Sequence, residues 1–241
     1  NFAYVASHDL QEPLRKIRAF SDRLSTSYAD VLDERGLDYF KRMRSASERM
    51  STLIEDLLAV SRLTSTTLAR DTVSLTDIAE DAAQALKEDI DDIGGTLTIT
   101  PLPSIEGDAS QLHRVFSNLL GNAYKYRSQT RPLAITVRDA SNDIQPPQSL
   151  DDGNRHGFYA ILVEDNGVGF DWQYAERIFA MFQRLHSRTD YKGTGIGLAI
   201  CRKIIERHYG AILVHRAQEN QGASFVIFLP KPAPTETPQD T

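Results

Sequence analysis

Two short glycine clusters are the features of this 241-residue sequence that best suit phosphate chemistry. One spans Asp165–Gly169, directly after the apolar run Phe158–Glu164, and the other spans Gly193–Gly197, directly before a helical pattern. Glycine at alternate positions lets the backbone approach a ligand and frees N–H groups to face phosphate oxygens, and a helix N-terminus adds partial positive charge. Either cluster alone is equally compatible with a turn and a helix cap. Neither continues into the Gly-Lys-Ser/Thr of a Walker A loop.

A polar stripe on one expected helix adds a second candidate. Asn118, Asn122 and Lys125 stand at i, i+4 and i+7, which is one face of a helix. An amide oxygen is a hard ligand that suits Mg²⁺ when phosphates supply the other ligands, and a lysine neutralises phosphate charge. The alternative is a solvated polar face. The stripe and the two glycine clusters together form a specific combination.

The third candidate is a nucleophile on a separate helix. Within the segment Ser7–Leu14, a heptad frame places His8 at an f position, facing solvent, with Asp9 beside it. A free imidazole close to neutral at pH 7 is a competent nucleophile, and Asp9 can orient it or accept its proton. Pro13 removes a helical hydrogen bond and is expected to bend the helix just past His8. The default alternative for a lone exposed histidine is an inert surface position.

The elements that carry His8 are expected to be two long helices. The first seventy residues hold one proline and one glycine, Pro13 and Gly36. Apolar residues recur at a and d heptad positions in two runs: Ala3, Ala6, Leu10, Ile17, Phe20 and Leu24, then Met43, Ala46, Met50, Leu53, Leu57 and Val60. Each stripe is wider than one partner helix covers, so the hairpin is predicted to dimerise into a four-helix bundle. The alternative is a solitary hairpin that lies on the second domain.

A second domain is expected after a polar linker at Thr64–Thr72, and we predict domains at 1–68 and 69–230 with a disordered, proline-rich tail at 231–241. Helical patterns and apolar runs alternate, which favours an α+β fold with helices on one sheet face. The helices are expected at 76–93, 108–127 and 194–209, and the strands at 96–100, 133–139, 158–164, 211–216 and 224–229. Residues 141–156 are interpreted as an exposed hairpin insert.

Composition excludes several classes of protein. A net charge of -6 argues against nucleic-acid binding. The single cysteine, Cys201, excludes an internal disulfide or cysteine-based zinc site and favours a reducing compartment, so we expect a cytoplasmic location. Whether the full-length protein is soluble or membrane-anchored stays open. No apolar run approaches the roughly 20 residues of a membrane span. Because the chain starts at Asn1 without an initiator Met, we expect a fragment whose sensor domain lies upstream.

The second domain, over roughly 72–230, resembles the ATP-binding domain shared by histidine kinases, Hsp90, type II topoisomerases and MutL, known as the GHKL or Bergerat type. Asn118–Tyr126 resembles the N box, Asp165–Gly169 and Gly193–Gly197 resemble the two glycine boxes, and Phe179–Phe182 resembles the F box. The segment Gly222–Phe225 resembles the small motif before the last strand. The resemblance implies an α/β sandwich that holds ATP between its helices and its sheet.

The same resemblance implies roles for individual residues. Asn122 would coordinate Mg²⁺, and Asp165 would accept a hydrogen bond from the adenine amino group. Lys125 would face the phosphates, and Tyr126 would pack near the base. The remaining nucleotide-binding residues would be Asn118, Gly167, Gly169, Gly193, Thr194, Gly195, Gly197 and Leu198, beneath a mobile lid at about 171–192. Arg127 departs from the Thr or Ser that usually follows the aromatic residue.

The N-terminal hairpin resembles the dimerisation and phosphoacceptor domain of sensor histidine kinases. His8-Asp9 followed by Pro13-Leu14 is similar to the H box, and the resemblance implies that His8 receives the ATP γ-phosphate and passes it to an aspartate of a response regulator receiver domain. Glu12 departs from the Thr or Asn of phosphatase-competent members, and we interpret it as an i,i+4 partner of Lys16. Gln11-Glu12 and Leu185–Tyr191 resemble kinases attached to phytochrome-like or PAS sensors.

The sequence therefore predicts a dimeric histidine autokinase of a two-component system. The competing hypothesis is an interaction module that binds nucleotide while the hairpin acts as a scaffold. An ATPase clamp such as MutL does not need the H box. Whether His8 is phosphorylated in cis or in trans stays open. Because His8 must meet ATP in line, we expect the domains to rearrange about Thr64–Thr72.

Overall fold

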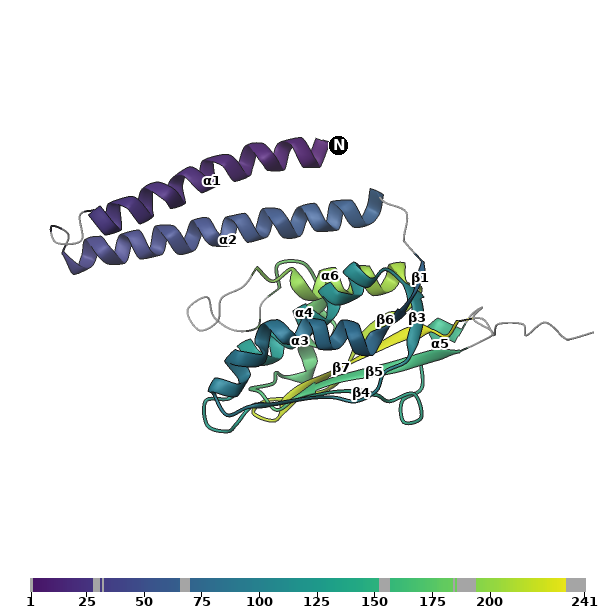
Figure 1. Ribbon diagram of the computed structural model, residues 1–241. Coiled ribbons are helices and arrows are strands. Elements are labelled where there is room, and N and C mark those ends of the chain that lie inside the picture. The colour runs from purple at the N-terminus through teal and green to yellow at the C-terminus, as the bar shows by residue number, and fades with distance from the viewer. Residues whose placement is uncertain are drawn as a thin grey trace, which may run out of the picture. The chain divides into compact units, whose positions relative to one another are not determined.

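The computed structural model describes residues 2–27, 31, 33–65, 70–151, 157–183, 185 and 194–232 (Figure 1). The chain divides into two compact units, a helical hairpin and a larger α/β unit. No helix among the described residues is long and apolar enough to cross a membrane.

The hairpin consists of α1 (Phe2–Ser27) and α2 (Glu34–Ser65), as the heptad pattern predicts. Helix α1 continues through Pro13. Asp33 caps α2, since its Oδ1 accepts a hydrogen bond from the Gly36 amide at 2.8 Å. Helices α1 and α2 pack against each other along their length. This unit therefore consists of two long antiparallel helices and not of a compact core.

The buried seam of the hairpin lies beside the predicted stripe, not along it. Leu14, Ser21 and Ser47 are buried, and Ser47 Oγ donates to the Leu14 carbonyl oxygen at 2.8 Å. In the stripe itself, Ala46 and Leu53 are half-buried, and six larger side chains are exposed: Ile17 44%, Phe20 63%, Leu24 40%, Met43 45%, Met50 43% and Leu57 55%. Small serines let the two helices approach closely, so the larger apolar side chains are left facing outward.

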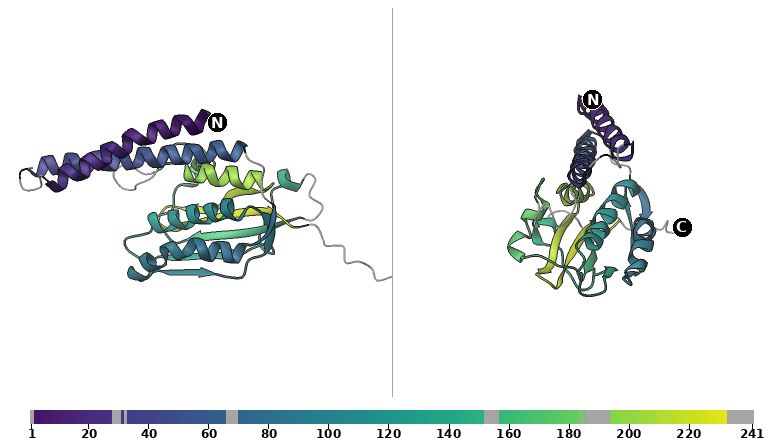
Figure 2. Two further views of the ribbon diagram at one scale, coloured as in Figure 1. Left: turned by 45° about the horizontal axis from the view of Figure 1, so that its top comes forward. Right: turned by 90° about the vertical axis from the view of Figure 1, so that its left-hand side faces the viewer.

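The α/β unit is a sandwich of helices on a mixed five-stranded sheet, which confirms the predicted fold class. Its helices α3 (Leu75–Asp92), α4 (Ala109–Lys125) and α6 (Gly197–Arg207) lie over one face of the sheet (Figures 1 and 2). The strand order is β2 (Thr96–Ile99), β4 (Ala134–Asp139), β5 (Phe158–Asp165), β7 (Gly222–Pro230) and β6 (Ala211–Gln218). Two short strands, β1 (Asp71–Ser74) and β3 (Ser104–Gly107), pair antiparallel.

The strand register brings the first glycine cluster to one end of the sheet. β2 and β4 are parallel, and the other neighbours in the sheet are antiparallel. Asp165, the last residue of β5, stands opposite Ile135 on one side and Ala223 on the other. The loop Asn166–Gly169 therefore leaves the sheet beside the start of β7.

The central strands β5 and β7 are buried on both faces of the sheet. On the face away from the helices, Phe158, Leu162, Val226 and Phe228 form an apolar cluster together with Ala140 and Ala160. Ile144 and Leu150 pack against this cluster. Residues 141–151 connect the antiparallel strands β4 and β5 through a turn and the one-turn helix α5 (Gln148–Asp151), and the side chains of 141–150 are exposed or half-buried, in agreement with the insert expected at 141–156. Residues 152–156 lie outside the described residues.

Local sequence signals set most element ends, with one exception at α6. Ser74 caps α3 through its side chain, and Asp108 caps α4 by accepting from the Ser110 and Gln111 amides. α6 begins at Gly197 and not at Thr194, because Gly195 has a positive φ of 75° that a helix does not accommodate. β1 and β3 were not predicted, since each carries a single large apolar residue, Val73 or Ile105, and therefore shows no alternation.

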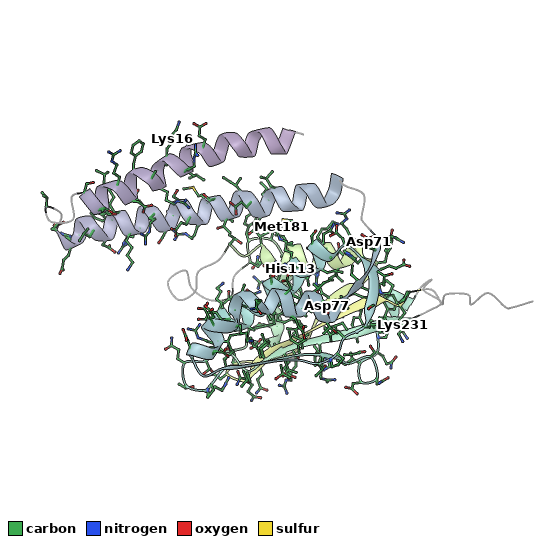
Figure 3. All side chains as sticks on the ribbon, viewed as in Figure 1. Lys16, Asp71, Asp77, His113, Met181 and Lys231 are labelled. Atoms are coloured by element: carbon green, nitrogen blue, oxygen red, sulfur yellow. The ribbon has the colours of Figure 1, made fainter. Side chains whose placement is uncertain are left out.

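Polar contacts between helices lie at the surface, and the cysteine lies in the core. His113 Nε2 is 3.3 Å from Asp81 Oδ2 across α3 and α4, and His113 is labelled in Figure 3. Cys201 is fully buried, and burial raises the pKa of its thiol to about 12. This confirms Cys201 as a packing residue.

Candidate functional site

Five of the predicted site residues line one cavity in the α/β unit. Asn122 and Tyr126 come from the end of α4, Asp165 and Gly169 from the first glycine cluster, and Leu198 from α6. The cavity volume is about 100 Å³. Its other lining residues are Phe170, Ile178, Gln183, Leu185, Ala223 and Phe225. The lining is therefore mostly apolar and holds one carboxylate.

That carboxylate, Asp165, is held by backbone donors at the end of β5. Its Oδ1 accepts from the Gly167 amide at 2.7 Å, and the Ala223 backbone also donates to it. Burial raises the pKa of Asp165 to about 6, and Glu164 adds to the rise while the two backbone donors and Arg131 oppose it. A buried carboxylate at the wall of an apolar cavity is a strong acceptor for a ligand N–H.

The glycines of the first cluster are required by close packing. A Cβ on Gly167 would strike the Tyr126 carbonyl oxygen, and a Cβ on Gly169 would strike the Gln218 carbonyl oxygen. Gly169 also has a positive φ of 60°. The loop is fixed on both sides, because the Val168 amide donates to the Tyr126 carbonyl oxygen at 2.8 Å and the Asn220 amide donates to the Val168 carbonyl oxygen at 2.6 Å.

Helices α4 and α6 meet at the second glycine cluster. A Cβ on Gly197 would lie 2.7 Å from Oδ1 of Asn118, so a larger residue at this position would displace the Asn118 side chain. Asn118 Nδ2 donates to the Arg114 carbonyl oxygen at 3.0 Å, which leaves its Oδ1 directed toward Gly197. The Thr194 hydroxyl accepts from the Ile196 amide at 3.4 Å. Gly193 lies outside the described residues.

Lys125 and Tyr126 interact with one another. Lys125 Nζ donates to the Tyr126 hydroxyl at 2.7 Å and lies 4.3 Å from the centre of that ring. Tyr126 lines the cavity, and Lys125 does not. The departure at Arg127 has a structural reason, because its Nη1 donates to the Tyr124 carbonyl oxygen at 3.0 Å and its guanidinium lies 4.4 Å from the Tyr124 ring centre. Arg127 therefore caps the C-terminus of α4.

The F box connects the cavity wall to α6. Phe179 is buried and packs edge-on against Phe225, with ring centroids 6.3 Å apart. Arg202 of α6 lies 4.1 Å from the Phe179 ring centre. Met181 and Phe182, by contrast, are 44% and 64% exposed (Met181 is labelled in Figure 3). Of the predicted lid at 171–192, residues 171–183 and 185 are described.

His8 and Asp9 belong to α1, and their side chains lie outside the described residues. One turn later, Glu12 Oε1 and Lys16 Nζ are 2.7 Å apart, which confirms their interpretation as an i,i+4 ion pair. Both side chains are about half exposed, so the pair contributes little to stability.

The donor set decides what kind of metal site fits here. Within the described ranges, no three His, Cys, Asp or Glu side chains gather closely enough to hold an ion by themselves. Asn122 offers one amide oxygen at the cavity. These residues fit Mg²⁺ only where phosphate oxygens and water complete an octahedral shell.

Sequence reasoning missed most of the remaining lining, which is apolar except for Gln183. Three of these residues lie after the first glycine cluster in the sequence and belong to no motif or periodic pattern: Phe170, Ile178 and Gln183. Ala223 and Phe225 belong to the small motif before the last strand, which the sequence did show, and the register with Asp165 brings that motif to the cavity.

Two family models match the chain. Residues 1–66 match the His Kinase A (phospho-acceptor) domain, and residues 107–233 match the histidine kinase-, DNA gyrase B- and HSP90-like ATPase family. The chain belongs to the sensor histidine kinases. Both halves of this kinase core are thus accounted for, with the hairpin in the first family and the cavity residues in the second.

Known relatives of the kinase core include phytochromes. Cyanobacterial phytochrome A of Nostoc sp. is 37% identical over 229 residues, which cover 95% of this chain and 28% of that protein. The phytochrome-like protein Cph1 of Synechocystis sp. is 34% identical over 229 residues, which cover 95% of this chain and 29% of that protein. The kinase core thus spans less than a third of the length of these two relatives. The similarity agrees with the expected phytochrome-like group.

A solved structure shares the fold. Full-length ShkA, crystallised in complex with AMPPNP, superposes with a TM-score of 0.66 at 24% identity, over 97% of this chain and 47% of that one. At this identity the likeness concerns the fold of the kinase core.

Proposed function

We propose that this kinase core phosphorylates itself on His8 from Mg-ATP and passes the phosphoryl group to an aspartate of a response regulator receiver domain. The observation that supports it most is the cavity, where the Asp165 carboxylate at the end of β5 meets the Tyr126 ring and the Asn122 amide at the end of α4. The family assignment supports the same reading, since both required domains are matched.

The base of ATP is assigned to the apolar part of the cavity. Asp165 would accept a hydrogen bond from the adenine amino group, and Tyr126 would pack near the ring. A base with an oxo group in place of the amino group would turn an acceptor toward the carboxylate. The geometry at Asp165 therefore favours adenine nucleotides.

The phosphates are assigned to the ends of α4 and α6. Asn122 would supply one oxygen to Mg²⁺, and Lys125 would turn from Tyr126 to face the phosphates. The N-terminus of α6 at Gly197 and Leu198 adds partial positive charge and free backbone amides. Bound Mg²⁺ would neutralise phosphate charge and leave the γ-phosphorus more open to attack.

The transfer itself needs little covalent chemistry from the protein. A neutral imidazole nitrogen of His8 attacks the γ-phosphorus with its lone pair, the bond from that phosphorus to the bridging oxygen breaks, and ADP leaves with the electron pair. The imidazole proton passes to Asp9 or to water. Positioning is then the main catalytic requirement, and the linker at Thr64–Thr72 must permit it.

Residues 1–68 are proposed to form a homodimer. Six large apolar side chains on α1 and α2 are between 40% and 63% exposed, as described for the hairpin. A second copy of the hairpin would cover this stripe and complete a four-helix bundle.

The test is incubation with γ-labelled ATP and Mg²⁺, comparing the intact chain with His8→Gln. Acid-labile, base-stable label that disappears in the variant is expected, because a phosphoramidate is lost in acid. Label that persists in the variant would show a different acceptor. Absence of label with nucleotide binding intact would favour the scaffold function.

A crosslink across the linker supplies a second test. Locking Thr64–Thr72 should abolish labelling of His8 and leave nucleotide binding unchanged. Continued turnover in the locked chain would contradict the proposed rearrangement.

A further inference from the structure

Arg131, in the connection between α4 and β4, donates two hydrogen bonds to the first glycine cluster. Its Nε donates to the Asn166 carbonyl oxygen at 2.6 Å, and its Nη2 donates to the Gly167 carbonyl oxygen at 2.6 Å. The planar guanidinium thus binds two successive carbonyls with two charge-assisted hydrogen bonds. Lysine, with a single point charge, cannot reproduce this fork.

One of the two carbonyls that Arg131 binds belongs to the peptide unit that donates a hydrogen bond to Asp165. The Asn166 carbonyl and the Gly167 amide belong to the same planar peptide unit. Arg131 holds its oxygen, and its N–H donates to Asp165 Oδ1 at 2.7 Å. The positively charged guanidinium beside the carbonyl oxygen polarises the peptide and strengthens its N–H as a donor. Arg131 therefore orients and stabilises the carboxylate through one peptide bond.

The Asn166 side chain binds two of the residues that follow Arg131. Its Nδ2 donates to the Pro132 carbonyl oxygen at 2.9 Å, and its Oδ1 accepts from the Ala134 amide at 2.9 Å. Arg131 thereby directly precedes a segment, residues 132–134, that the Asn166 side chain binds at both ends. The connection and the glycine cluster form one hydrogen-bonded unit.

We propose that Arg131 is a positioning residue for nucleotide recognition, which acts through the Asn166–Gly167 peptide to keep the Asp165 carboxylate aligned and charged for an amino-bearing base. The inference rests on the proposed function, because it assumes that Asp165 receives the adenine amino group. It adds a residue that lies outside the cavity lining and outside the motifs of the sequence.

Electrostatics point the same way. The Arg131 charge lowers the pKa of Asp165, while burial, the dominant cause, and the neighbouring Glu164 raise it. Glu164 is itself paired with Arg216 of β6 at 3.1 Å. Without Arg131, Asp165 is protonated at a higher pH. A protonated carboxyl can donate to an oxo group, so discrimination against guanine should weaken as well.

The experiment uses the full chain with Arg131→Ala and Arg131→Lys, and Arg138→Ala as the matched control. Arg138 lies on β4 and pairs with Asp143 at 2.7 Å, so its loss removes an arginine contact away from the cavity. Calorimetric titration with Mg-ADP and Mg-GDP from pH 5 to 9 gives affinity, base preference and the pH midpoint of binding. Thermal unfolding of each variant reports on folding.

Arg131→Ala should weaken ADP binding about tenfold, in keeping with the loss of charge-assisted hydrogen bonds. Its pH midpoint should move upward, and its preference for ADP over GDP should narrow. Arg131→Lys should fall between Arg131→Ala and the wild type, and Arg138→Ala should match the wild type. Equal losses for both nucleotides with an unchanged pH midpoint would overturn the proposal.

A carboxyl titration followed by NMR separates this inference from the proposed function. The Asp165 pKa should rise in Arg131→Ala and stay unchanged in Arg138→Ala. An unchanged Asp165 pKa would overturn the inference even when wild-type ADP binding is intact. Failure of the wild type to bind ADP would overturn the proposed function and the inference with it, whatever the titration shows.

Discussion

The backbone amide of Asp108 donates a hydrogen bond to Nε2 of His208 at 3.0 Å, although the two residues are 100 positions apart. Nδ1 of the same ring is 2.8 Å from the Ile204 carbonyl oxygen, so Nδ1 carries the proton and the ring is neutral. Asp108 is the N-cap of α4, and His208 follows α6 directly. The hydrogen bond thereby joins α4 and α6 at the ends that do not line the cavity.

His208 should make the α/β unit sensitive to acid. Burial lowers the pKa of His208 below its usual value of 6.5. The unfolded chain therefore binds this proton at a higher pH than the folded chain, so the free energy of unfolding should fall as pH drops below about 6.5. In His208→Gln, the slope between pH 7.5 and 5.5 in urea unfolding should be smaller than in the wild type. Identical slopes would contradict the prediction.

Asp165→Asn should separate stability from nucleotide binding. Burial raises the pKa of Asp165 from its usual 3.8 to about 6 in the folded chain, so its negative charge opposes folding at neutral pH. Removing the charge should stabilise the chain by about 2–3 kcal/mol at pH 8, and the gain should vanish as pH falls below about 4. ADP affinity should decrease at least tenfold. A variant less stable than the wild type at pH 8 would refute this prediction.

Alanine at two glycines should produce opposite kinds of damage. Gly197→Ala would place a Cβ 2.7 Å from Asn118 Oδ1, and that side chain can rotate away. We expect a loss of nucleotide affinity with little change in thermal unfolding. Gly169→Ala instead meets the Gln218 backbone and a positive φ of 60°, neither of which can yield cheaply. It should lower the unfolding midpoint by several degrees. Equal thermal effects in the two variants would disprove the distinction.

A charge on the exposed stripe should disrupt the proposed dimer. Phe20 is 63% exposed on α1, and Phe20→Asp would place a carboxylate in the four-helix interface. Light scattering should show a shift from dimer to monomer. Thr26→Asp adds the same charge at another exposed position of α1 and should leave the dimer intact. A dimeric Phe20→Asp chain would argue against this interface.

Local pattern was sufficient for most elements and for part of the site. The periods of 3.6 and 2 predicted α3, α4 and the five strands of the large sheet, because each of these segments carries its own apolar face. The same reasoning predicted apolar stripes wider than one helix covers, and six of their side chains are exposed in the single chain. An apolar stripe shows that a surface must be covered, but it does not say whether the second helix or a second chain covers it.

Contacts between distant segments carried no local signal. The 141–151 segment looked polar, yet Ile144 and Leu150 pack on the far face of the sheet. The Gln111 side chain donates to the Asp108 carboxylate, while His208 accepts from the Asp108 amide. The residues at the start of α4 look the same in the sequence whether the Asp108 amide bonds to a nearby side chain or to His208, 100 positions away.

The sequence by itself determined the family, the helical hairpin and the glycine clusters, because periodicity, capping and glycine spacing act within a few residues of one another. Tertiary structure alone decided that Arg131 holds the peptide bound to Asp165, and that small serines close the hairpin seam. These relationships depend on which chain segments pack side by side. A guanidinium or a serine has no preference for a partner until folding brings one within hydrogen-bond distance.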